Sequence, residues 1–222
     1  MKISPSKPHV EPRPIARIGK SDRTRAAILN AALDFVWSNP FRDMTVGGLM
    51  EATGLSRSAF YQYFGDLHEL MEALLHLLED EILAVAEAWF TETGDPVALL
   101  KDSLSGLVDV SYRLGPILRG TSDAASNDKR LENAWGKFLS RFDDAVAARI
   151  EADQQQGLIP EFDARPVAMG LNRLDAYTLI EAFGRRPRSK KEPVRKALER
   201  LWISSLYGSQ WIERETSDLV RT

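Results

Sequence analysis

Apolar residues in this chain recur every three or four positions over most of its length, and no other feature restricts the fold as strongly. One long stripe occupies positions 67, 70, 71, 74, 78, 82, 85 and 89, and another occupies positions 131, 135, 138, 139, 142, 146 and 150. This spacing places apolar side chains on one face of an α-helix. No segment alternates apolar and polar residues for long enough to predict a β-strand. The sequence therefore predicts an all-α fold.

Capping residues, glycines and prolines divide the pattern into about nine helices. We expect them near residues 22–38, 45–53, 56–64, 66–93, 95–114, 116–126, 128–156, 163–184 and 191–213. Asp66 followed by Glu69 is a capping-box pattern, which marks the start of the fourth helix. Gly115 and Pro116 are expected to end the fifth, because proline disrupts a helix interior.

Charge is divided unevenly along the chain. Residues 1–65 carry nine Lys and Arg against five Asp and Glu, whereas the remaining residues carry 20 against 27. A basic end on an acidic remainder suits a protein whose one end meets a polyanion, although short terminal segments are often basic simply for solubility. Residues 1–20 contain four prolines and scattered basic residues, and we expect them to form a flexible basic arm.

Composition excludes several classes of protein. The 222 residues include no cysteine, which rules out disulfides, thiolate zinc sites and cysteine nucleophiles. No apolar run approaches the roughly 20 residues that span a bilayer. The N-terminal stretch lacks the apolar segment of a secretory signal. We therefore expect a cytoplasmic protein, and nothing in the sequence indicates a cofactor.

Residues 45–64 have the pattern of a helix-turn-helix, in which two short helices are joined by a turn at Gly54. On a helical wheel the second helix has an inward face with Ala59, Phe60, Tyr63 and Phe64. Its outward face, which could read base edges and contact phosphates, contains Arg57, Ser58, Tyr61 and Gln62. Thr45 and Ser56 cap the two helices, whose free N–H groups suit a phosphate. Any short amphipathic helix pair divides similarly, so the wheel alone leaves a merely solvated surface open.

The spacing T-x-x-x-L-x-x-x-x-G-x-S-x-x-x-F-Y-x-Y-F over residues 45–64, preceded by A-A-L-D-F and followed by D-L-H-E-L, resembles the DNA-binding domain of the TetR family. The resemblance implies a dimeric, ligand-responsive regulator, usually a repressor, that binds a palindromic operator. It implies a DNA-binding domain over 21–66 and a ligand-binding and dimerisation domain over 67–222. By position, Arg57 and Ser58 would approach base edges, Tyr61 and Gln62 would contact bases and phosphates, and Thr45 and Tyr63 would hold phosphates.

Two positions depart from the family pattern. Gly47-Gly48 stands where polar helix formers are usual, and each glycine costs about 1 kcal/mol relative to alanine in a helix. We therefore expect the burial of Leu49 and Met50 to hold this helix. Leu67 stands where many members place a lysine against the DNA backbone, so that contact is doubtful here.

The body is rich in aromatic residues, most of which are expected in the helical core. Asn172 and Asp175 are polar residues on a largely apolar helix, and each needs a partner, either a neighbouring side chain or a ligand's polar end. Residues 172–183 and 201–208 resemble the TetR branch that includes the mycobacterial ethionamide-resistance repressor. The resemblance implies a long aromatic cavity for an apolar ligand, with Asp175 replacing the second asparagine of a pair. The candidate ligand contacts are Trp89, Tyr112, Trp135, Phe138, Phe142, Asn172, Asp175 and Trp202.

The last two helices carry small and medium apolar residues that suit a homodimer interface, and the family dimerises in this way. These residues are Val167, Leu171, Leu174, Thr178, Ala197, Leu198, Leu201, Ser205 and Gly208. Ligand in the body is expected to tilt the helix over 66–92 and to move the two DNA-reading heads out of register.

Other interpretations remain open at this point. His68, Glu72 and His76, spaced by four, could form a metal-binding face, although a solvated helix surface is the simpler interpretation and we expect no metal site. An enzyme is disfavoured, because the chain has no phosphate loop, no G-x-S-x-G pattern and no cysteine. A helical carrier of lipids or other apolar ligands, without a DNA function, is the main alternative.

Overall fold

The computed structural model describes residues 23–208, and every regular element in this range is helical. The elements are α1 (Arg23–Ser38), the 3-10 helix η2 (Phe41–Asp43), α2 (Val46–Thr53), α3 (Arg57–Tyr61), α4 (Leu67–Thr91), α5 (Pro96–Ala125), α6 (Lys129–Gln155), α7 (Ala164–Phe183) and α8 (Lys191–Leu206). The prediction of an all-α fold is confirmed. The expected basic arm over 1–20 and the end of the last expected helix lie outside the described residues.

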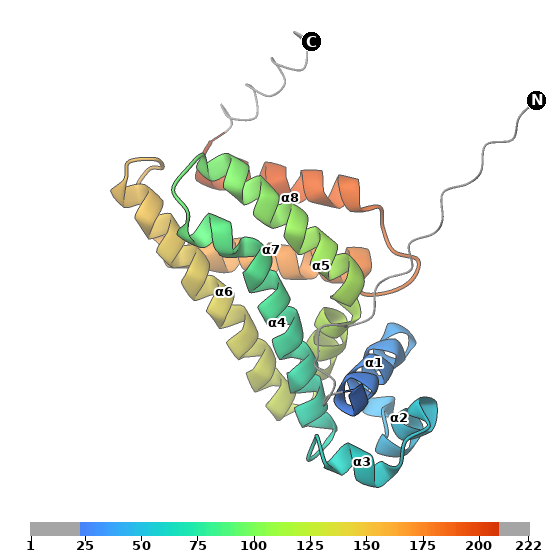
Figure 1. The fold of residues 1–222 in the computed structure, drawn as a ribbon. Helices are drawn as coiled ribbons and strands as arrows, with labels where there is room; N and C mark the ends of the chain where they lie inside the picture. Colours follow the sequence, from blue (N-terminus) through green and yellow to red (C-terminus); the bar gives the residue numbers. More distant parts are fainter. Residues whose placement is uncertain (1–22, 209–222) are drawn as a thin grey trace, which may run out of the picture.

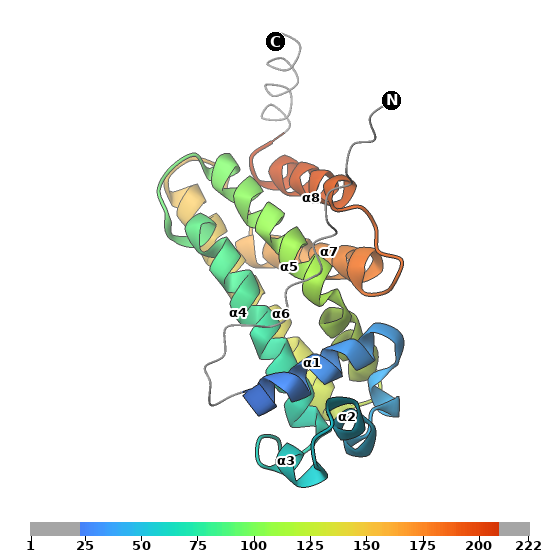
Figure 2. The same ribbon diagram turned by 45° about the vertical axis from the view of Figure 1, so that its right-hand side comes forward.

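The first three helices lie together at one end of the molecule, which we call the head (α1–α3; Figure 1). The long helix α4 leads from the head into the body (α4–α8), where it packs along α5 and α6. α7 packs against α5 and α6, and α8 lies against α5 at the end of the body away from α3 (Figure 2). None of the described helices is long and apolar enough to cross a membrane.

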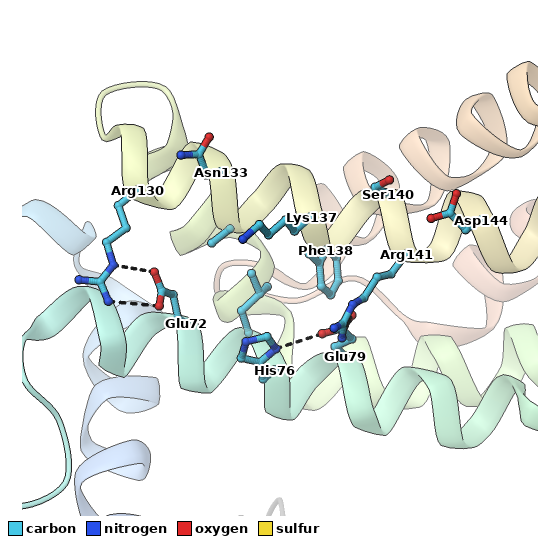
Figure 3. Close-up of a pocket in the computed structure, with 12 residues that line it drawn as sticks. Glu72, His76, Glu79, Arg130, Asn133, Lys137, Phe138, Ser140, Arg141 and Asp144 are labelled. Atoms are coloured by element: carbon cyan, nitrogen blue, oxygen red, sulfur yellow. Dashed lines mark hydrogen bonds and ion pairs between the residues drawn. The ribbon is translucent and has the colours of Figure 1, made fainter.

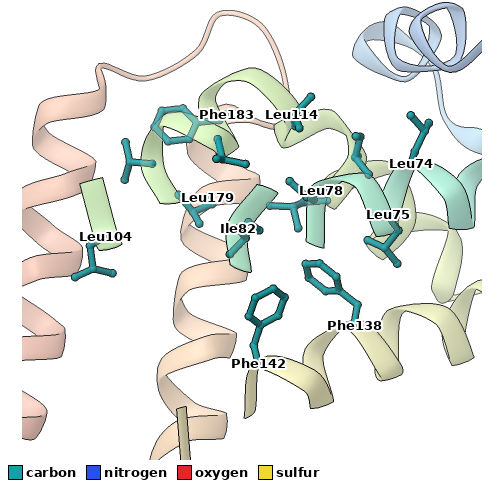
Figure 4. Packing of buried hydrophobic residues seen from close by; sticks show 14 of the residues in the cluster. Leu74, Leu75, Leu78, Ile82, Leu104, Leu114, Phe138, Phe142, Leu179 and Phe183 are labelled. Carbon is teal, nitrogen blue, oxygen red and sulfur yellow. The ribbon is translucent and has the colours of Figure 1, made fainter. Parts of the chain in front are cut away.

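Leucine, isoleucine and phenylalanine side chains from α4, α6 and α7 fill the centre of the body (Figure 4). Leu78 of α4 is fully buried, and Ile82 one turn later is 7% exposed. They share the core with Phe138 and Phe142 of α6 and Leu179 of α7. Burying a side chain of this size contributes about 1.5–3 kcal/mol, so this packing holds α4 in place along the body.

The N-cap expected at the start of α4 is present, but Glu69 accepts from Gly65, one residue before the partner that a capping box requires. Asp66 Oδ1 accepts a hydrogen bond from the N–H of Glu69 at 2.8 Å, and the Glu69 carboxylate accepts one from the N–H of Gly65 at 2.7 Å. The first bond satisfies an N–H group that the helix itself leaves free, and the second ties the preceding turn to the first turn of the helix. They fix the point at which the head ends and α4 begins.

The expected break at Gly115 and Pro116 is wrong, because α5 continues from Pro96 to Ala125. Pro116 has no N–H for the carbonyl oxygen of Tyr112, four residues earlier, and the guanidinium of Arg188 donates to that oxygen instead, at 2.6 Å. A Cβ at Gly115 would lie 2.7 Å from the carbonyl oxygen of Phe183, so glycine allows the end of α7 to approach. The segment that joins α7 to α8 therefore supplies the hydrogen bond that the proline removes.

Candidate DNA-reading surface and ligand cavity

Two capped helices and a left-handed turn form the helix-turn-helix. Thr45 Oγ1 accepts from the N–H of Gly48 at 3.1 Å, and Ser56 Oγ accepts from the N–H of Ala59 at 3.3 Å. Between the helices, Gly54 has a φ of 69°, a conformation that residues with a Cβ rarely adopt. Because Thr45 and Ser56 are exposed, the N-termini of α2 and α3 both face solvent.

The side chains of α3 divide as the helical wheel predicts. Phe60 and Phe64 are 0% and 2% exposed, whereas Tyr61 is 60% exposed. The other three outward candidates, Arg57, Ser58 and Gln62, are also exposed, and Tyr63 is half-buried. The helix is shorter than expected, ending at Tyr61 rather than Phe64, and a turn follows it. The surface for DNA contact is therefore present, and the contacts themselves remain a prediction.

Glycine at position 47 has a local explanation. A Cβ there would lie 2.6 Å from Nη2 of Arg57, so the guanidinium lies close against the start of α2 and would have to shift if the glycine were replaced. The rest of α2 is held as expected, because Leu49 and Met50 are 2% and 1% exposed. The departure at Gly47 thus affects where the arginine of α3 is placed.

A small cavity of about 60 Å³ lies in the body where the ligand site is expected. Helices α4 to α7 supply its walls, which are formed by Ile82, Leu107, Leu118, Phe138, Leu139, Phe142, Asn172, Asp175, Ala176 and Leu179. Pockets for drug-sized ligands usually measure about 300–1,000 Å³. A ligand of that size therefore requires side chains of the wall to move.

Four of the eight candidate ligand contacts line this cavity, namely Phe138, Phe142, Asn172 and Asp175. The other four lie around or away from it. Trp202 lies behind Asp175, with Trp89 packed edge-on against it, and Trp135 stacks on the ring of Phe138. Tyr112 lies elsewhere, against Phe183 and under the guanidinium of Arg188.

The two polar residues of the cavity wall, Asn172 and Asp175, each form one hydrogen bond with a protein group. Asn172 Nδ2 donates to Asp143 of α6 at 2.9 Å, and Arg173 pairs with the same carboxylate oxygen at 2.6 Å. Asp175 is 7% exposed, and its Oδ1 accepts from Trp202 Nε1 at 2.9 Å. Burial raises the pKa of Asp175 to about 7, and the Trp202 hydrogen bond opposes that rise only in part. One N–H of the Asn172 amide and one oxygen of the Asp175 carboxyl therefore have protein partners.

Two larger hollows are lined by charged residues. One of about 570 Å³ separates α4 from α6, where Arg130 binds Glu72 and where both Arg141 and His76 contact the buried carboxylate of Glu79 (Figure 3). The other, of about 950 Å³, lies between head and body, and its wall includes Trp37, Arg42, Arg119, Arg185 and Arg186. Sequence reasoning missed both, because their walls come from distant segments and carry no local pattern.

The histidine-rich face of α4 does not gather into a metal site. His68, Glu72 and His76 each have a different partner, respectively Asp128, Arg130 and Glu79. Within residues 23–208 no three metal-ligating side chains come together.

Known proteins share this architecture. Residues 100–208 match the family described as transcriptional regulator EthR, C-terminal domain. The HTH-type transcriptional regulator EthR of Mycobacterium tuberculosis is 28% identical over 204 residues, covering 88% of this chain and 92% of that protein. A TetR-family regulator from Syntrophomonas wolfei has the same fold, with a TM-score of 0.73 at 14% identity over 83% of this chain and 95% of the other. The SmeT–triclosan complex has a TM-score of 0.71 at 18% identity, over 83% and 91%.

An exposed helix-turn-helix on an all-helical body is the arrangement of a helix-turn-helix transcriptional regulator, the class that these relatives define. The EthR relatives are named as HTH-type transcriptional regulators. The chain has the fold of TetR-family regulators, and its body is similar to the C-terminal domain of EthR.

Proposed function

We propose that this regulator binds a near-palindromic operator as a dimer and leaves it when a small, mostly apolar ligand occupies the body cavity. The proposal divides the chain into a DNA-binding domain (21–66) and a ligand-binding and dimerisation domain (67–222). The observation that carries the DNA part is the exposed face of α3, on which Arg57, Ser58, Tyr61 and Gln62 lie near the solvent-facing N-termini of α2 and α3.

Each residue of this surface has a role that suits its chemistry. Arg57 can donate two hydrogen bonds to the major-groove edge of guanine, with Ser58 beside it at a neighbouring base. Tyr61 and Gln62 are placed to contact bases and phosphates. Thr45 and the exposed part of Tyr63 hold phosphates, which sets the register without reading sequence.

We place the dimer interface on the outer faces of α7 and α8. Met169 and Tyr177 of α7 and Leu201 of α8 are large apolar side chains with 41%, 60% and 43% of their surface exposed. Two residues expected in the interface are unavailable, because Leu171 and Leu198 are buried within the protomer at 6% and 0% exposure. A two-fold dimer would present two copies of α3 to half-sites one or more DNA turns apart, about 34–36 Å per turn.

Two helices connect the cavity to the head. Ile82 of α4 and Leu118 of α5 both line the cavity, and α4 begins directly after the helix-turn-helix. The residue that follows Leu118 is Arg119, whose guanidinium donates to the carbonyl oxygens of Val36 in α1 and of Gly184 after α7, the latter at 3.0 Å. A ligand that enlarges the cavity would therefore displace the head through both helices. SmeT, which has the same fold, is solved as a complex with triclosan.

The test is selection of bound DNA from a random pool, followed by titration of the selected site and a scrambled site. Arg57→Ala should weaken binding to the selected site by about 1–3 kcal/mol, the range for one bidentate base contact, with little change on scrambled DNA. Lys137→Ala removes an exposed positive charge from the body and should leave specific binding unchanged. Equal losses on both DNAs would mean that Arg57 is not a base-reading residue.

A further inference from the structure

One oxygen of Asp175 is left without a protein partner. Oδ1 accepts the Trp202 hydrogen bond, whereas Oδ2 has no hydrogen-bond or ion-pair partner among the described residues. The residue is 93% buried and lines the 60 Å³ cavity. A carboxylate in a largely apolar wall is costly unless a hydrogen-bond donor or an opposite charge stabilises its oxygens. It marks the place where a ligand atom would be bound most strongly.

The surroundings of this oxygen define what kind of atom it can receive. The wall of the cavity is formed mostly by apolar side chains, none of which can donate a hydrogen bond. They include Ile82 from α4, Leu107 and Leu118 from α5, and Phe138 and Phe142 from α6. Asn172 is the other polar residue of the wall, and it does not titrate. The nearest cation on the same helix, Arg173, is paired with Asp143 instead. No protein cation therefore neutralises Asp175.

We propose that the effector of this regulator is a lipophilic amine, whose protonated nitrogen donates to Asp175 Oδ2 while its apolar part fills the space among Ile82, Phe138 and Phe142. This rests on the ligand-responsive function proposed above and names the chemical class of its ligand. A carboxylate ligand would be repelled at this point. A neutral alcohol could donate one hydrogen bond but would supply no charge, and a charge-assisted bond is roughly twice as strong as a neutral one.

The acidity of the carboxyl supports this assignment. With a pKa of about 7, Asp175 is divided between its neutral and ionised forms near neutral pH, and a bound cation would favour the ionised form. The pKa shift comes from burial and from Trp202 alone, and no other wall residue titrates. An amine that stays protonated should therefore bind more tightly as the pH rises, by up to about tenfold per pH unit below pH 7, and reach a plateau at higher pH.

The experiment compares three probes of one shape on the full-length protein without DNA. These are 4-phenylbutylamine, 4-phenylbutan-1-ol and 4-phenylbutanoate. Binding is followed by calorimetry and by tryptophan fluorescence. The fluorescence should respond to the ligand because the indole N–H of Trp202 donates a hydrogen bond to Asp175. We expect the amine to bind at least about tenfold more tightly than the alcohol at pH 8, and the carboxylate to bind least.

A matched pair of variants assigns this preference to one residue. Asp175→Asn removes the charge inside the cavity and should abolish both the amine preference and its pH dependence. Asp102→Asn removes a charge from the exposed surface of α5 and should preserve both. Equal affinity of the wild-type protein for amine and alcohol, no detectable amine binding at millimolar concentration, or a preference that survives in Asp175→Asn would each overturn the proposal.

Operator release, measured afterwards with the same probes, separates this inference from the proposed function. Asp175-dependent amine binding without release of DNA would contradict the coupling of cavity to head and leave the ligand class standing. Release of DNA by the alcohol as readily as by the amine would contradict the ligand class and leave the coupling standing.

Discussion

Replacing Asp175 by asparagine should change how the stability of this protein depends on pH. In the folded chain the pKa of Asp175 is about 7, against 3.8 for an unperturbed aspartate. The unfolded state therefore releases its proton at a lower pH than the folded state does. As the pH rises from about 4 to about 7, the unfolded state binds fewer protons, so the free energy of unfolding of the wild-type protein falls.

The size of the effect follows from the shift. A difference of about three pKa units corresponds to about 4 kcal/mol between the two protonation states. About 2 kcal/mol of this has already been lost at pH 5, which leaves about 2–3 kcal/mol to be lost between pH 5 and pH 8. Asparagine cannot ionise, so the stability of Asp175→Asn lacks this dependence on pH. Its amide oxygen can still accept the Trp202 hydrogen bond, and an unsatisfied amide N–H in the cavity would add an offset that does not vary with pH.

Urea unfolding of both proteins at pH 5 and pH 8 measures this pH-dependent contribution to the free energy of unfolding. The difference in unfolding free energy between Asp175→Asn and the wild type should move by about 2–3 kcal/mol in favour of the variant at the higher pH. Asp102→Asn, on the exposed surface of α5, should follow the wild type. If the difference for Asp175→Asn is the same at both pH values, the carboxyl does not titrate in this range, and the reasoning from its burial fails.

Three further changes test the packing, the dimer and the coupling. Gly115→Ala places a methyl group 2.7 Å from a carbonyl oxygen at the end of α7 and should destabilise the protein by about 1–3 kcal/mol. Its control, Gly136→Ala, has no atom within 4 Å of the new methyl group and should stabilise the protein by up to about 1 kcal/mol. If urea unfolding ranks the two variants in the opposite order, α5 does not approach the end of α7 this closely. The double change Tyr177→Glu with Leu201→Glu should give a folded monomer in sedimentation that no longer binds the operator with high affinity, and a surviving dimer would place the interface elsewhere. Arg119→Met removes the hydrogen-bond donors to α1 and to Gly184. A ligand should still bind the body, but it should weaken operator binding by less than in the wild-type protein, with the loss amounting to part of the typical coupling free energy of about 1–3 kcal/mol. Undiminished release of the operator would exclude this contact from the coupling.

The parts of the fold that depend on neighbouring residues could be predicted from the sequence. The start of α4 follows from Asp66 and Glu69, the turn of the helix-turn-helix from Gly54, and the two faces of α3 from residue spacing. Each depends on contacts within about four positions of the chain, which a helical pattern contains. This is why the DNA-reading candidates came out exposed as a group, apart from the half-buried Tyr63.

The parts of the fold that depend on distant segments could not be predicted from the sequence. Pro116 carries the usual signal of a helix end, yet the compensating donor, Arg188, lies in another segment and has no local signature. The composition of the cavity wall could not be predicted either, because its residues come from four helices. The candidates Phe138 and Asp175 both line the cavity, whereas Tyr112 packs against Phe183. Apolar spacing also cannot tell which side of a helix faces its own protomer, so Leu171 and Leu198 looked suited to an interface although they are buried in the core.

The course of α5 explains why a ligand in the body could be sensed at the head. Over five consecutive residues this helix contacts the end of α7 at Gly115, runs through Pro116, lines the cavity with Leu118, and binds α1 with Arg119. The segment after α7 returns to the same place, because Arg186 and Arg188 lie over the ring of Trp37 in α1 while Arg188 also holds the carbonyl oxygen that Pro116 leaves free. Movement of Leu118 would thus disturb Arg119 and Arg188 together, and both hold the end of α1. The continuity of α5 through its proline, which the sequence argued against, therefore gives the body a second connection to the head beside α4.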